Sequence, residues 1–260
     1  MLTNIGNKTV PTVIAILLIY VTWVSAMDTP AMEQIDAGMN RALAVFAGAR
    51  ALNAAISLLQ GTEVSVGFVA GVTLSVGQIL DPVNDLVESF SNLMLISSVA
   101  FGIQKVLLAI GQYEYVKIAV TVMLLAWGVV RVIKGMTPRW LDVALVLMLM
   151  ARFAIPVATM GSDAVYAHFL QQDYAEGQKT LTTMTEELNK DADPGSLSSL
   201  DPRPIIERMK QVATSATDHV IKLIVVFLLQ TLLVPVFLLW VMYTALRAML
   251  AGGRSTRQFL

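Results

Sequence analysis

The chain of 260 residues contains no cysteine and only two histidines, His168 and His219. Without thiols it can form no disulfide, no thiolate nucleophile and no cysteine-ligated zinc or iron–sulfur centre. Two histidines also exclude a histidine-rich metal site within one chain. The sequence contains no HExxH, no GxSxG, no P-loop and no dinucleotide-binding glycine motif. We therefore expect a protein that is not an enzyme and that carries no cofactor or metal.

Charged residues are also scarce. They make up 14% of the chain, whereas hydrophobic residues make up 56% and the mean hydropathy is +0.67. Soluble domains have about 25% charged and about 45–50% apolar residues. The apolar excess lies in long runs, which is typical of a polytopic membrane protein. The predicted fold class is therefore all-α, a membrane helical bundle of four to six transmembrane helices. The net charge of −1 gives no reason to expect nucleic acid as a partner.

Six apolar runs are long enough to consider as spans. Residues 10–26 follow Lys8 and fit either an N-terminal anchor within 1–28 or a signal peptide that is cleaved after Ala26. Three runs are strong and carry Trp or Tyr at an end: 115–133, 140–160 and 220–246. Two weaker runs, 64–80 and 93–110, are of minimum spanning length and could instead be buried or re-entrant helices.

Basic residues predict the orientation. They cluster between two strong spans and again after the last one, at Arg131, Lys134, Arg139, Arg247, Arg254 and Arg257. By the positive-inside rule both places are cytoplasmic, as are both termini, and residues 163–218 lie outside. The expected location is the inner (plasma) membrane of a bacterium. Between Met27 and Gly111 the chain then crosses the membrane either twice or not at all, so six and four spans both remain open.

Residues 163–218 combine helical spacing with a central loop. The first leg has apolar residues at Val165, Phe169, Leu181, Met184 and Leu188. The second leg has a helix-start signal at Asp201-Pro202, and its apolar residues at three–four spacing are Ile205, Met209, Val212, Ala216, Val220, Leu223 and Phe227. These patterns predict an extracytoplasmic helical hairpin with coiled-coil character. Its legs extend a transmembrane hairpin (112–162) and a C-terminal transmembrane helix with a basic tail (219–260).

An acidic stretch interrupts the Ala/Gly-rich helical region 29–111. Asp81, Asp85 and Glu88 are spaced by four and three, and on a helix they share one face with Asn92. Asp81 precedes Pro82, which predicts an N-cap for an amphipathic helix over 81–92. The acidic face has two interpretations: a water-facing side of an interfacial helix, or a stripe lining a pathway, where a ring of acids in an oligomer selects cations. Carboxylates at this spacing could also hold calcium or magnesium.

Arg152 lies well inside a predicted span. A mid-span arginine is normally paired and faces protein or water. Asp142 lies ten residues earlier on the same helix, which is too far for a direct contact. We therefore expect a partner on another helix and consider Asp85 and Glu88 as candidates. The pair would be either structural or part of an ion pathway.

Small residues recur at intervals of four at two places, Gly67–Gly71–Ser75 and Ala47–Ala51–Ala55. Such rows let helices approach closely, either within one subunit or between subunits. The leading functional expectation is an oligomeric, channel-like assembly that conducts cations. The alternatives are a non-conducting scaffold or accessory subunit of an envelope complex and, third, a small secondary transporter. The expected partners are the lipid bilayer, further copies of the chain, and other membrane proteins that bind the 163–218 hairpin.

Overall fold

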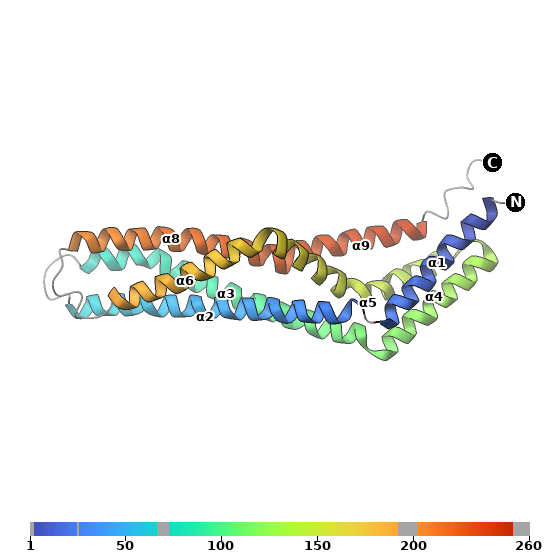
Figure 1. Ribbon diagram of the computed structural model, residues 1–260, viewed down its shortest axis with the longest axis horizontal. Coiled ribbons are helices and arrows are strands. Elements are labelled where there is room, and N and C mark those ends of the chain that lie inside the picture. Colours follow the sequence, from blue (N-terminus) through green and yellow to red (C-terminus); the bar gives the residue numbers. More distant parts are fainter. Residues whose placement is uncertain (1–2, 25, 67–72, 192–201, 252–260) are drawn as a thin grey trace. The chain divides into compact units, whose positions relative to one another are not determined.

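The computed structural model describes residues 3–24, 26–66, 73–191 and 202–251, and within these ranges every regular element is a helix (Figure 1). In chain order the elements are α1 (Thr3–Val24), α2 (Asp28–Val66), α3 (Thr73–Gln112), α4 (Glu114–Lys134), α5 (Arg139–Val165), the π-helix η1 (Tyr166–Leu170), α6 (Gln171–Asp191), α8 (Pro202–Leu228), the π-helix η2 (Leu229–Leu233) and α9 (Val234–Ala251). This confirms the all-α fold class.

Five helical stretches of the described chain are long and apolar enough to cross a bilayer. They are Asp28–Leu58, Leu80–Gln112, Glu114–Lys134, Arg139–Lys190 and Gln211–Ala248. A shorter apolar helix covers Val13–Val24. The chain is thus a membrane protein by the length and composition of its helices.

The contacts divide the chain into two compact units. Unit 1 contains Met1–Asp36, Gly102–Ala164 and Leu233–Leu260, and unit 2 contains Ala37–Phe101 and Val165–Leu232. The chain passes between the units four times, always within helical segments. Two of these boundaries lie at or next to a π-helix: one falls just before η1 and one falls inside η2.

Unit 1 is built around α1, α4 and α5. Its core contains Ala15 of α1, Leu124 and Trp127 of α4, and Leu145 and Leu149 of α5, with side chains from α9 packed against it. The outer side of these helices is also apolar, since large side chains such as Ile16, Leu125 and Ile133 are exposed. A helix that is apolar all round suits a lipid environment.

Unit 2 is a bundle of four helical segments from α2, α3, α6 and α8. α6 packs against α8, and the residues that the sequence placed in the hairpin seam are buried: Leu181, Met184, Leu188, Val212, Ala216, Val220, Leu223 and Phe227. Close approach of these two helices depends on Gly177, since a Cβ there would lie 2.6 Å from Leu223 Cγ. The predicted helical hairpin and its start at Pro202 are therefore confirmed. Asp201 and the side chains of Ile205 and Met209 lie outside the described part.

Phe169 does not belong to this seam, contrary to the sequence-based expectation. Its side chain is 76% exposed, whereas Tyr166 and Leu170 are buried against Val226. The cause is the π-helix η1, whose wider turn shifts the residues that follow onto a different face. A pattern of regular 3.6-residue spacing cannot anticipate that shift.

The acidic stretch also differs from the prediction. α3 begins at Thr73, so Asp81 and Pro82 lie inside a 40-residue helix and Asp81 is not its N-cap. Interior proline costs one backbone hydrogen bond. Burial of Leu80, Val83 and Val87 on the inner face offsets this cost, so the helix continues through Pro82.

Candidate functional site

The acidic face of α3 points away from the core of unit 2. Asp81, Asp85, Glu88 and Asn92 are all exposed, whereas Val83, Val87 and Phe90 are buried. Two of the four polar residues contact α2: Gln60 donates a hydrogen bond to Asp81 at 2.9 Å, and Arg50 donates one to Asn92 at 3.3 Å. Asp85 and Glu88 remain as an outward-facing pair of carboxylates between these two contacts.

The surroundings of this face are polar. Arg50 bonds Asn92 of α3, and two residues earlier on α2 a Cβ on Gly48 would meet Leu181 of α6 at 3.9 Å. Asn92 and Leu181 therefore lie against the same turn of α2. Beyond Leu181 the outer side of α6 carries polar residues such as Glu186, Glu187 and Lys190. The acidic face thus belongs to a part of unit 2 whose exterior suits water.

Further along α3 the exterior changes character. Leu95, Ile96 and Val99 are exposed immediately after Asn92. α8 shows a similar change, because Asp218 and Lys222 are exposed before the exposed apolar Val225. Each helix therefore passes from a polar to an apolar exterior without interruption.

Arg152 is the second candidate, and its partner is Asp28. The guanidinium donates two hydrogen bonds to the carboxylate, at 2.7 Å from Nη1 and 2.6 Å from Nη2. Nη2 also donates to the backbone carbonyl of Thr22 at 3.3 Å. The expectation that Asp85 or Glu88 pairs with Arg152 is therefore wrong. The sequence did not indicate Asp28 as the partner because it lies just after the first apolar run, where acidic residues at the membrane–water interface are common.

The local geometry explains why Asp28 suits this role. It is the first residue of α2, where a negative charge is favoured by the helix dipole. The backbone of α5 at Arg152 is approached by Gly111, since a Cβ there would lie 3.2 Å from the Ala151 carbonyl oxygen. α1, α2, α5 and the end of α3 thus meet around one buried ion pair.

A second ion pair also begins on α2. Lys105 of α3 lies 2.6 Å from Asp36, and both side chains are about two-fifths exposed. Asp28 and Asp36 are two turns apart on α2. Ion pairs therefore connect the first turns of α2 to α5 through Asp28 and to α3 through Asp36.

Asp142 has a different environment from Arg152. It accepts hydrogen bonds from Trp127 Nε1 at 3.0 Å and from Thr137 Oγ1 at 2.6 Å, and it is buried. These bonds join α4, the turn after Gly135 and the start of α5. Asp142 is therefore a local cross-link of the transmembrane hairpin and, as the sequence indicated, does not pair with Arg152.

One cluster in unit 2 had no clear signal in the sequence. The guanidinium carbon of Arg41 lies 3.9 Å from the centre of the Tyr166 ring, which is the first residue of η1. Tyr166 packs edge-on against Tyr174, and Tyr174 packs edge-on against Phe227 of α8. A cation on an aromatic face is favourable, and the wider π-turn brings Tyr166 inward to receive it.

The small-residue rows are only partly described. Gly67 and Gly71 lie outside the described residues, as does the side chain of Ser75. In the alanine row Ala55 is buried, but Ala47 and Ala51 are exposed, so the row does not form one packing face within the chain. Within the part of the chain that the structure describes, no three His, Asp or Glu side chains lie close enough to hold a metal ion.

The comparisons with known proteins found no matching family model, no matching curated protein and no matching solved structure.

Proposed function

We propose that the protein is a subunit of an oligomeric assembly in the inner membrane of a bacterium, which holds an acidic helical bundle outside the bilayer. The observation that supports this most strongly is the unbroken passage of α8 from a polar to an apolar exterior. The apolar part of α8 continues through η2 into α9, so one helix of the bundle runs directly into a stretch long enough to cross the bilayer, Gln211–Ala248.

The contacts of α2 support four spans rather than six. Asn92 of α3 and Leu181 of α6 lie against the same turn of α2. The basic clusters predict that the hairpin containing α6 is outside, with both termini in the cytoplasm. The acidic face is then outside as well, which is the arrangement expected when the chain does not cross the membrane between Met27 and Gly111.

In its conducting form the assembly uses this face as a vestibule. Asp85 and Glu88, repeated around an axis, would raise the local cation concentration at the mouth of a pathway. In the non-conducting form the same carboxylates bind a basic surface of another envelope protein, and the chain is a scaffold or accessory subunit.

Conductance of the purified protein in planar bilayers tests the conducting form. We expect cation-selective current, and the Asp85→Asn/Glu88→Gln double variant should lose selectivity at low salt. At 1 M salt the two proteins should become alike, because the Debye length falls to about 3 Å. The matched control is Glu186→Gln/Glu187→Gln, which removes two exposed acids from α6 and should leave the current unchanged.

Absence of current, or equal selectivity of the double variant and the wild type, contradicts the conducting form. The scaffold form is then tested by the mass of the detergent-solubilised particle. A monomer under conditions that preserve native folding contradicts both forms.

A further inference from the structure

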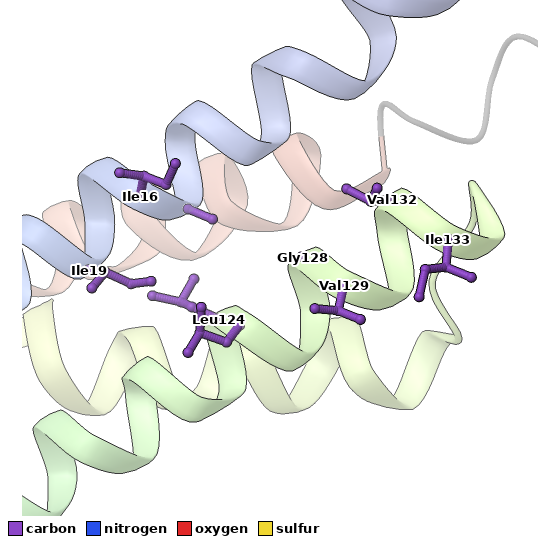
Figure 2. Close-up of a pocket in the computed structure, with 9 residues that line it drawn as sticks. Ile16, Ile19, Leu124, Gly128, Val129, Val132 and Ile133 are labelled. Carbon is purple, nitrogen blue, oxygen red and sulfur yellow. The ribbon is translucent and has the colours of Figure 1, made fainter.

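The side of unit 1 formed by α1 and α4 contains an apolar groove of about 430 Å³ (Figure 2). Figure 2 shows Ile16 and Ile19 of α1 on one side and residues from Leu124 to Ile133 of α4 on the other. Among the residues whose side chains the structure describes, those that line the groove are aliphatic or glycine. The volume falls in the range of about 300–1,000 Å³ that is typical of small-molecule sites.

Two contacts give the direction of the groove. Trp23 Nε1 near the end of α1 donates to Thr121 Oγ1 in the first half of α4 at 3.0 Å, whereas Ile16, earlier in α1, lines the groove together with residues 124–133, later in α4, so the two helices run antiparallel. From there the groove extends along α4 as far as Ile133. At 1.5 Å per residue, Leu124 to Ile133 covers about 14 Å. This is close to half of the hydrocarbon thickness of about 30 Å, the depth of one leaflet.

The end of the groove is basic. Lys134 follows Ile133 directly and is exposed, and Arg139 is exposed at the start of α5. Arg131, one turn earlier, lies over the Trp127 ring at 5.9 Å. An apolar channel of one-leaflet depth with cations at its interfacial end matches a lipid that has an acyl chain and an anionic headgroup.

The geometry points to a binding site for an anionic glycerophospholipid, with one acyl chain between α1 and α4 and the headgroup phosphate at Lys134 and Arg139. Gly128 is the part of the wall that leaves room for the chain, because a Cβ at this position would have no heavy atom within 4 Å. The same basic residues predict that this end of the groove faces the cytoplasm, so the bound lipid belongs to the inner leaflet.

Native mass spectrometry tests the site on the full chain, purified in detergent with equimolar phosphatidylglycerol and phosphatidylcholine. The wild type should retain phosphatidylglycerol in preference to phosphatidylcholine. Lys134→Gln should reduce this preference about fivefold, the effect of one basic residue near an anionic headgroup. Gly128→Leu should abolish retention of both lipids by filling the groove.

Two matched controls distinguish the groove from general effects. Gly102→Leu places the same side chain on α3, where a Cβ also meets nothing within 4 Å, and it should leave lipid retention unchanged. Lys222→Gln removes an exposed lysine from α8 and should preserve the phosphatidylglycerol preference.

Equal retention of the two lipids by the wild type overturns the proposal, as does full retention by Gly128→Leu. If Gly128→Leu leaves the lipids bound but reduces the mass of the oligomer, a helix of a second copy occupies the groove instead. If this variant does not fold, the wild type is photolabelled with phosphatidylglycerol carrying a diazirine in its acyl chain. Adducts should map to residues 13–24 and 124–134, and adducts confined to other segments overturn the site.

Discussion

Arg152 and Asp28 are 124 residues apart in the chain and form a two-point ion pair with distances of 2.7 and 2.6 Å. Only 1% of the arginine side chain and 5% of the aspartate side chain are exposed. Parallel hydrogen bonds from guanidinium to carboxylate are strong and geometrically specific. The pair therefore fixes the position of the first turn of α2 against the middle of α5.

Loss of either partner should destabilise the protein strongly. Asp28→Asn leaves the Arg152 charge buried without a counter-ion, and breaking a buried pair in this way costs about 3–5 kcal/mol. We expect a clear drop in the thermal unfolding midpoint in detergent. The control is Asp36→Asn, the same change on the same helix, whose pair with Lys105 is about two-fifths exposed. Its cost should be at most about 1 kcal/mol.

A double variant separates charge burial from packing. Asp28→Leu/Arg152→Met removes both charges, and apolar replacements of a buried pair are often neutral or stabilising. The double variant should therefore unfold at a higher temperature than either single variant. If it unfolds at a lower temperature than both, the ion pair itself stabilises unit 1 and the desolvation argument is wrong.

Gly177 should be intolerant of even a methyl group. A Cβ there would meet three Leu223 side-chain carbons at 2.6–2.9 Å, and Leu223 is fully buried. We expect Gly177→Ala to cost about 1–3 kcal/mol through overpacking. Addition of Leu223→Ala should recover part of this loss, and circular dichroism melting measures both effects.

Gly48→Ala is the matched control for Gly177→Ala. Its Cβ would meet Leu181 at 3.9 Å, which is ordinary contact. Alanine is favoured over glycine in a helix by about 1 kcal/mol, so this variant should be as stable as the wild type or more stable. Equal destabilisation by the two substitutions would contradict the close approach of α6 and α8.

The sequence was sufficient for features that depend on local pattern. Composition and run length predicted the all-α membrane fold, and three–four spacing predicted the burial of Leu181, Met184 and Leu188. It failed where a residue responds to its neighbours in space. The exposure of Phe169 follows from a π-turn, and the extension of α3 past Asp81 follows from packing that offsets the cost of Pro82.

The candidate site shows the same division. The requirement that Arg152 be paired follows from the cost of burying a charge within a membrane span, which depends only on the position of the arginine in the apolar run. The choice of Asp28 depends on how α1 and α2 return to α5, and no spacing along the chain encodes it. The Arg41–Tyr166 contact likewise needs α2 and η1 side by side.

Trp127→Phe should weaken the transmembrane hairpin. The substitution keeps an aromatic ring in the core but removes the indole N–H that donates to Asp142 at 3.0 Å. A buried acceptor that loses a partner costs about 1–3 kcal/mol. Thr137→Val removes the hydroxyl that donates to Asp142 at 2.6 Å and should give a loss of similar size. Unfolding midpoints unchanged from wild type in both variants would show that these bonds do not stabilise the α4–α5 connection.

The absence of cysteine makes the proposed topology directly measurable, because single cysteines can be introduced without background. Asp85→Cys on α3, Glu187→Cys on α6 and Met136→Cys in the turn before α5 are all at exposed positions. With four spans, a membrane-impermeant maleimide added outside intact cells should label Asp85→Cys and Glu187→Cys, whereas Met136→Cys should react only after permeabilisation. If Asp85→Cys instead reacts only after permeabilisation, as Met136→Cys does, while Glu187→Cys reacts in intact cells, the acidic face lies in the cytoplasm. The chain must then cross the membrane twice between Met27 and Gly111.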